Sequence, residues 1–175
     1  MDETQLLPTS GRIVGVDFGT VRIGVAISDP GQTLSSPLDV YNRRSKSLDA
    51  KYFQELVGHE SLAGFVVGLP IHTNGDESEK SRQARNFSKW LRNETSIPVV
   101  MFDERFTTSM ARQLLNQSTL SGKKRKERLD KIAAHVLLTA FLEARDKAVA
   151  VDFSSTNSNQ SIEDKHSETA TKATD

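Results

Sequence analysis

The segment from Gly11 to Asp29 constrains the fold of this chain most, because its pattern predicts two β-strands joined by a tight turn. Branched apolar residues fill both halves of the segment, and they favour a pleated, half-buried surface. Gly19 stands where the chain must reverse, which favours a hairpin. Asp17 ends the first strand, where a buried charge costs free energy unless a cation pairs with it. Asp17 therefore either caps the turn or faces a ligand. The second alternative is possible because Gly19 leaves room for a ligand to approach closely.

The chain after the hairpin alternates between patterns typical of strands and of helices. Strand patterns cover residues 34–41, 64–69 and 98–102, and helical patterns cover residues 47–57, 78–92, 107–115 and 126–149. Pro37 marks an edge strand or a strand start, and Ser47 and either Thr107 or Thr108 are the expected helix N-caps. The apolar run 64–69, bounded by glycines, is typical of a central parallel strand. These elements predict an α/β fold with a mixed five-stranded sheet, antiparallel in its first three strands, and flanking helices.

Apolar residues at helical spacing predict which helix faces are buried. On the helix over 78–92 the inward residues are Ala84, Phe87, Trp90 and Leu91, and on the last helix they are Ile132 or Ala133, Val136, Leu137, Ala140 and Phe141. Because Trp90 belongs to such a face, we expect it in the core rather than as a platform on which bases stack.

The length of 175 residues predicts one domain of ordinary size. We assign residues 1–10 to a flexible leader, residues 11–150 to the domain and residues 151–175 to a polar tail. The tail consists mostly of Ser, Thr, Asn and charged residues, so burial cannot repay the entropy of ordering it. We therefore expect the tail to be disordered.

The composition excludes several classes of protein. The chain has no cysteine, which excludes disulfides and cysteine-based zinc sites, and its four histidines lack the spacing of metal ligands. No run of eighteen apolar residues is present to cross a membrane, and the first ten residues do not resemble a secretory signal. We therefore expect a cytoplasmic protein, either a monomer or a homodimer.

Three acids are candidates for a catalytic site because of their positions. Asp17 and Glu104 end strands, and Asp130 lies at the start of the last helix, where Ala133 and Ala134 would let the helix backbone approach the sheet. Gathered carboxylates repel one another unless a divalent cation lies between them, and oxygen ligands without Cys or His suit Mg²⁺ or Mn²⁺. Two such ions about 4 Å apart can activate water and stabilise the leaving oxygen of a phosphodiester. The three acids therefore predict the catalytic and metal-binding residues of a metal-dependent nuclease.

The same acids also have a simpler interpretation, as partners in exposed ion pairs that contribute little to stability. The candidate pairs are Glu104 with Arg105 or Arg22, and Asp130 with Lys126 or Lys131. Two other acids near strand ends, Asp29 and Asp103, are expected to form turns or end strands rather than to bind a ligand.

Basic residues gather in one segment although the net charge is zero: residues 122–131 hold six of them. Such a run is either a solvated loop or a contact to phosphates. We predict that the side chains contacting a nucleic-acid backbone are Arg22, Arg105, Lys123, Lys124, Arg125 and Lys126. Arg22 could instead orient Asp17.

Four motifs, in order, resemble those of the YqgF/RuvX family across residues 11 to about 146. They are residues 17–29, residues 67–70 with Gly75, residues 103–108 and residues 130–134. The resemblance implies a ribonuclease-H-like fold related to Holliday-junction resolvases. It also implies a nuclease that matures the 5′ end of pre-16S ribosomal RNA, with its acidic site on Asp17, Glu104 and Asp130. Phe106 and Thr139 depart from the leucine and glutamine that are usual in the family.

Three other functions remain open at this point. The turn after Asp17 also resembles the phosphate-binding turn of actin-like and sugar-kinase ATPases, although those proteins close two such domains over the nucleotide and this chain has material for one. A non-catalytic nucleic-acid-binding module could use the same scaffold, because fold does not fix function. Within the nuclease class, branched DNA is the competing substrate of ribosomal RNA precursor.

Overall fold

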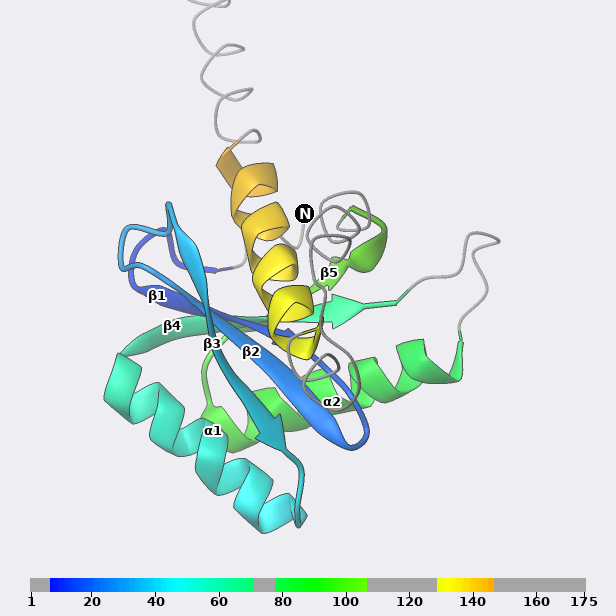
Figure 1. Cartoon of the computed structure of the whole chain (residues 1–175). Helices are drawn as coiled ribbons and strands as arrows, with labels where there is room; N and C mark the ends of the chain where they lie inside the picture. The colour runs from blue at the N-terminus through cyan, green and yellow to red at the C-terminus, as the bar shows by residue number, and fades with distance from the viewer. Residues whose placement is uncertain (1–6, 71–77, 107–128, 147–175) are drawn as a thin grey trace, which may run out of the picture. The chain divides into compact units, whose positions relative to one another are not determined.

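A computed structural model describes residues 7–70, 78–106 and 129–146 of the chain (Figure 1). Residues 1–142 form one compact unit, in which five strands make a single sheet in the order β3-β2-β1-β4-β5. Of the second unit, residues 143–175, only the helical residues 143–146 are described. The segments 1–6, 71–77, 107–128 and 147–175 lie outside the described residues, and with them the predicted helix over 107–115, the basic residues 123–126 and the polar tail.

The predicted hairpin is confirmed. Strands β1 (Arg12–Asp17) and β2 (Arg22–Ser28) pair antiparallel, with Gly24 opposite Asp17. A Cβ on Gly19 would stand 2.3 Å from the carbonyl oxygen of Arg22, so the reversal needs a glycine there. Strand β3 (Ser35–Asn42) pairs antiparallel with β2 and forms one edge of the sheet. An edge strand tolerates Pro37, which has no backbone N–H to donate.

The apolar run in the middle of the chain forms the predicted central strand. Strand β4 (Leu62–Leu69) lies between β1 and β5 (Val99–Asp103) and is parallel to both. Because parallel strands end at the same edge of the sheet, Asp17 and the residues that follow Asp103 come to the same edge. The short 3-10 helix η2 (Glu104–Phe106) begins there.

Helices α1 (Lys46–Glu60) and α2 (Glu79–Thr95) begin after serine N-caps. The N-cap of α1 is Ser45, so the prediction of Ser47 is wrong by two residues. The reason lies in Asp49, whose buried carboxylate accepts a hydrogen bond from the backbone N–H of Arg44 and so holds the chain just before Ser45. Ser45 then accepts the backbone N–H of Leu48.

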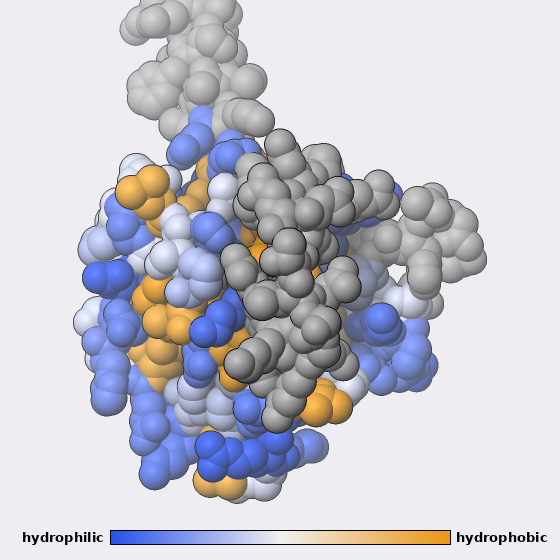
Figure 2. Space-filling view, viewed as in Figure 1, coloured by the Kyte–Doolittle hydropathy of each residue, from blue (hydrophilic) through white to orange (hydrophobic). Residues whose placement is uncertain are grey.

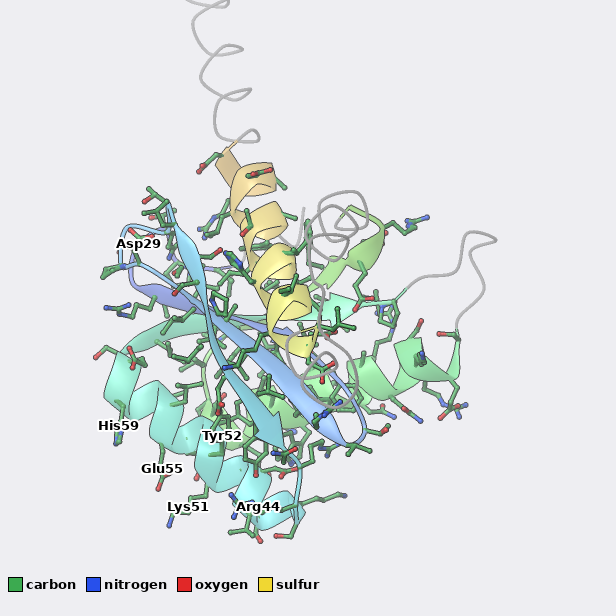
Figure 3. All side chains as sticks on the ribbon, in the orientation of Figure 1. Asp29, Arg44, Lys51, Tyr52, Glu55 and His59 are labelled. Atoms are coloured by element: carbon green, nitrogen blue, oxygen red, sulfur yellow. The ribbon has the colours of Figure 1, made fainter. Side chains whose placement is uncertain are left out.

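Alternation along the strands divides the buried side chains between two faces of the sheet. On one face, Val14, Val16 and Val25 pack with Phe53 of α1 and Phe87 of α2 in the main hydrophobic cluster. The outer side of α1 is hydrophilic in Figure 2, and Figure 3 shows Lys51, Glu55 and His59 directed away from the sheet. No helix in the described part of the chain is long and apolar enough to span a membrane.

The helix 129–146, drawn in yellow and orange in Figure 1, packs through its residues up to 142 on the other face of the sheet. Two glycines allow a close approach: a Cβ on Gly15 would stand 2.7 Å from the Cβ of Leu138, and one on Gly24 would stand 2.2 Å from the carbonyl oxygen of Asp130. The predicted inward residues Val136, Leu137 and Phe141 are buried. Ala134, which the sequence places toward the sheet, is fully buried. The predicted inward face missed the fully buried Leu138, and it included residues that are only half-buried: Ile132, Ala133 and Ala140.

Candidate active site

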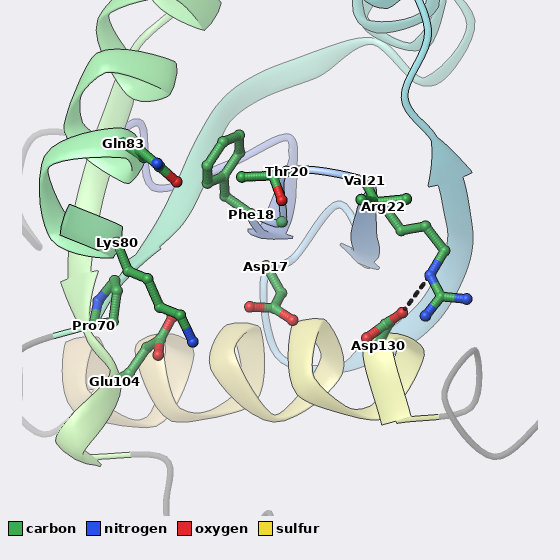
Figure 4. Close-up of a pocket in the computed structure, with 11 residues that line it drawn as sticks. Asp17, Phe18, Thr20, Val21, Arg22, Pro70, Lys80, Gln83, Glu104 and Asp130 are labelled. Atoms are coloured by element: carbon green, nitrogen blue, oxygen red, sulfur yellow. Dashed lines mark ion pairs between the residues drawn. The ribbon is translucent and has the colours of Figure 1, made fainter. Parts of the chain in front are cut away.

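A cavity of about 390 Å³ lies at the carboxyl ends of the strands, and its lining includes Asp17, Glu104 and Asp130 (Figure 4). The structure therefore brings the three predicted acids together. In Figure 4, Asp17 lies between Glu104 and Lys80 on one side and Asp130 and Arg22 on the other.

The alternation of side chains explains why the first two acids reach this cavity. Asp17 follows Gly15 at a spacing of two, so both belong to the face of the sheet that the helix 129–146 covers. Glu104 stands two residues after Phe102, whose ring centroid lies 5.6 Å from that of Phe141 on the same helix. The alternation along β1 thus selects the face on which Asp17 emerges, and Glu104, the first residue of η2, reaches the same cavity from the end of β5.

Gly68, on β4, makes the space for Glu104. A Cβ on Gly68 would stand 2.6 Å from Oε1 of Glu104 and 3.3 Å from its Cγ. In the structure the space beside Gly68 holds a side chain of the site itself.

Asp130 takes its place from the helix and its orientation from Arg22. The helix backbone lies against Gly24, and the carboxylate Oδ2 of Asp130 forms an ion pair with Nε of Arg22 at 3.0 Å. The sequence left open whether Arg22 contacts a phosphate, orients Asp17 or pairs with Glu104; in the structure it pairs with Asp130. The alternative pair of Asp130 with Lys131 is not seen among the described residues, and Lys126 lies outside them.

The electrostatics of the cavity favour a positively charged ligand. Burial, with the neighbouring charge of Asp130, raises the pKa of Asp17 to about 6, although Lys80 lowers it. Burial, with the charges of Asp17 and Asp103, raises the pKa of Glu104 to about 7, again against Lys80. Burial and like charge thus both disfavour the ionised carboxylates, and a bound cation would favour them.

Lys80 is a cavity residue that the sequence analysis missed. It lies on the first turn of α2 and lines the cavity with Pro70 and Gln83. No signal in the sequence separated it from the other exposed lysines, because its role depends on where the N-terminal end of α2 meets the strand ends.

Several other predicted residues lie elsewhere. Nε of Arg105 pairs with the Asp103 carboxylate at 2.8 Å, and neither residue is among those that line the cavity. Asp29 accepts the backbone N–H groups of Gly31, Thr33 and Leu34, which confirms its expected role in a turn.

The donor set fits a hard divalent cation by its chemistry, since all three acids are half-buried carboxylates that line one cavity. The fit is incomplete in position. Among the described residues, no three acidic or histidine side chains lie close enough together to hold one ion. To become the third ligand of an ion, Asp130 would have to give up its ion pair with Arg22.

Comparison with known proteins decides the family. Residues 11–144 match the model of the RuvX family, described as Holliday junction resolvase. The chain belongs to the RuvX family. A Rhodopirellula baltica relative, named "Putative pre-16S rRNA nuclease", is 50% identical over 137 residues, 78% of this chain and 79% of the relative. A relative of the same name from Koribacter versatilis is 41% identical over 135 residues, 77% of this chain and 88% of that one.

The solved structures show the fold of this RuvX member. The yeast mitochondrial Holliday junction resolvase Ydc2 matches it with a TM-score of 0.50 and 9% identity, over 82% of each chain. The predicted ribonuclease-H-like fold is therefore confirmed. Membership of the RuvX family makes the chain a nuclease, a hydrolase of phosphodiester bonds.

Proposed function

We propose that this RuvX member is a divalent-metal-dependent nuclease that processes the 5′ end of pre-16S ribosomal RNA in the cytoplasm. In this proposal Asp17, Glu104 and Asp130 are the catalytic and metal-binding residues. The observation that carries it is that these three carboxylates, from two strand ends and a helix, line one cavity. The names of the two relatives support the choice of substrate.

The roles of the residues follow from their chemistry. Asp17, Glu104 and Asp130 would hold the ion, which when bound supplies the charge that lowers the pKa of a water molecule and stabilises a leaving oxygen. Lys80 lines the same cavity, where its ammonium group can bind a phosphate oxygen of the substrate. Arg22 keeps Asp130 in place until substrate or metal competes for it.

Predicted contacts along the rest of the substrate belong to Lys123, Lys124, Arg125 and Lys126. These residues would bind backbone phosphates without reading sequence, as lysine and arginine do in most nucleic-acid complexes. Arg105, which is exposed and paired with Asp103, could exchange that carboxylate for a phosphate.

Two alternatives keep specific support. The description of the family model favours a four-way DNA junction as substrate. The ion pair of Asp130 with Arg22, and the lack of a converged group of ligands in the described residues, would suit a module that binds nucleic acid without cleaving it.

One assay separates these functions. The full chain is incubated with a pre-16S 5′ fragment and with a four-way DNA junction, each in Mg²⁺, in Mn²⁺ and in chelator. We expect cleavage of the RNA that needs the metal and that Asp17→Asn abolishes, while Glu79→Gln, an exposed acid next to Lys80, leaves it unchanged. Cleavage of the junction alone would establish the resolvase. Binding of either substrate without cleavage in any metal would establish the binding module.

A further inference from the structure

A second cavity, of about 280 Å³, adjoins the candidate active site. The two cavities share three lining residues, Phe18, Thr20 and Gln83. Because these residues line both cavities, a ligand that enters the second cavity lies beside the cavity that holds the proposed catalytic carboxylates. The volume is at the lower limit for ligand pockets, roughly 300 Å³, which suits one small group and not a double helix.

One wall of this second cavity is aromatic. The ring of Phe18 stacks on that of Phe87 with centroids 4.6 Å apart, and Phe87 contacts Trp90 at 5.4 Å. Trp90 packs against the main hydrophobic cluster, as predicted, but it is half-buried and also lines the cavity. Its indole N–H has no hydrogen-bond partner in the part of the chain that the structure describes.

The rest of the second cavity is cationic and polar. Arg43 places its guanidinium 5.3 Å from the centre of the Phe18 ring, and Lys46 begins α1 nearby. The side chains of Lys46 and Asn86 form no hydrogen bond or ion pair within residues 7–70, 78–106 and 129–146. The described residues that line this cavity include no acid, in contrast to the active site next to it.

We propose that the second cavity binds one unpaired nucleotide of the substrate strand, next to the phosphate that is cleaved. The base lies against Trp90, with its polar edge toward Asn86, and its phosphate lies against Lys46. An aromatic wall beside cations is what a base with its phosphate requires, and a base offers its face only when it is not stacked in a duplex. This inference rests on the proposed nuclease function and adds that the strand is single at the cut.

Trp90 is the only tryptophan of the chain, so its fluorescence reports on this cavity directly. The full chain is titrated in chelator, which prevents cleavage, with a short single-stranded RNA. The same titration uses an abasic strand of equal length and the RNA annealed to its complement. We expect saturable quenching by the single strand, binding without quenching by the abasic strand, and no quenching by the duplex.

Two exposed residues of the cavity give the variants. Lys46→Gln and Asn86→Ala should each weaken the affinity for the single strand, measured by quenching, roughly three- to tenfold. Their matched controls are Lys89→Gln and Asn93→Ala, which change exposed residues of α2 that line neither cavity. The controls should bind as the unchanged protein does.

Quenching that is equal for the abasic strand, or equal for the duplex, would overturn the nucleotide site. The nucleotide site would also be overturned if the single strand quenched Lys46→Gln and Asn86→Ala as it quenches the unchanged protein. Failure of the cleavage assay with normal quenching would remove the nuclease function and leave the nucleotide site in place. Cleavage of the RNA without any quenching would remove the nucleotide site and leave the nuclease function in place.

Discussion

The carboxylate of Glu104 occupies the space in which a side chain at Gly68 would lie, 2.6 Å from the position of its Cβ. The obstacle is the end of a flexible side chain, so Gly68→Ala can be accommodated by movement of the carboxylate. We expect cleavage to fall at least tenfold, because the carboxylate leaves its position, while the melting temperature changes little. Initial rates at saturating substrate and a thermal melt check both parts.

Gly58→Ala is the matched control for this substitution. Gly58 lies in α1, and nothing lies within 4 Å of a Cβ there. Alanine should stabilise the helix by about 0.5–1 kcal/mol and leave cleavage unchanged. A drop in cleavage for Gly58→Ala equal to that of Gly68→Ala would show that the effect does not come from Glu104.

Gly24→Ala should act on the fold itself. A Cβ on Gly24 would stand 2.2 Å from the carbonyl oxygen of Asp130, and a helix backbone cannot turn away as a side chain can. We expect a loss of about 1–3 kcal/mol in the free energy of unfolding, measured with denaturant, together with loss of cleavage. A variant of unchanged stability would mean that the helix 129–146 does not lie on β2 in solution.

The glycines show where the sequence stops being informative. The strand pattern placed Asp17 and Glu104 at strand ends, and the alanines after Asp130 indicated a close approach to the sheet. The partner surface for that approach, Gly15 and Gly24, could not be assigned, because glycine inside a strand pattern is equally consistent with a bulge.

Which basic side chains lie beside the three acids could not be fully predicted either. Lys80 is one of 23 basic residues, and only its three-dimensional position separates it from the rest. Arg22 stood out in the sequence, but its pairing with Asp130 did not. Trp90 was assigned to the core from its helical spacing. That was right for the side of the ring that packs on Phe87, but spacing along one helix cannot reveal a cavity formed with another element.

Asp17→Asn should stabilise the metal-free protein. The substitution keeps the shape of the side chain and removes a buried charge that Asp130 repels. In Mg²⁺ the order should change, because binding of the ion raises the melting temperature of the unchanged protein by mass action and that of the variant much less. Thermal melts across a range of Mg²⁺ concentrations test this. Equal responses to Mg²⁺ would remove Asp17 from the metal site.

Asp49 should make the fold sensitive to acid. Burial acts to raise its pKa, but hydrogen bonds from the backbone N–H of Arg44, from the Tyr41 hydroxyl and from Arg43 outweigh it and lower the pKa. The stabilisation is complete above the pKa of the unfolded chain, about 3.9, and is lost as the pH falls through the lower folded value. Asp49→Asn should therefore cost roughly 3 kcal/mol at neutral pH.

The difference between Asp49→Asn and the unchanged protein should shrink below about pH 4. Denaturant unfolding at several pH values measures it. Glu55→Gln, an exposed acid on the same helix paired with Lys51 at 3.7 Å, serves as control and should change stability by less than about 0.5 kcal/mol at every pH. A gap for Asp49→Asn that widens in acid would contradict the lowered pKa.

The basic segment should act through charge alone. Replacement of Lys123, Lys124, Arg125 and Lys126 by alanine should weaken binding across all sequences and flatten its salt dependence, by roughly one unit of slope per lost phosphate contact. Binding measured over a series of salt concentrations gives the slope. An unchanged slope would make the segment a solvated loop.

The contact of the Asp130 backbone with Gly24 has a consequence for folding during synthesis. Synthesis from the N-terminus delivers Asp17 and Glu104 before Asp130, and the same docking that buries Ala134 and Leu138 brings in the last carboxylate. A chain caught part-way through synthesis thus holds an incomplete set of acids on an uncovered sheet. If these acids are the proposed catalytic set, that set and the core are therefore completed in the same step.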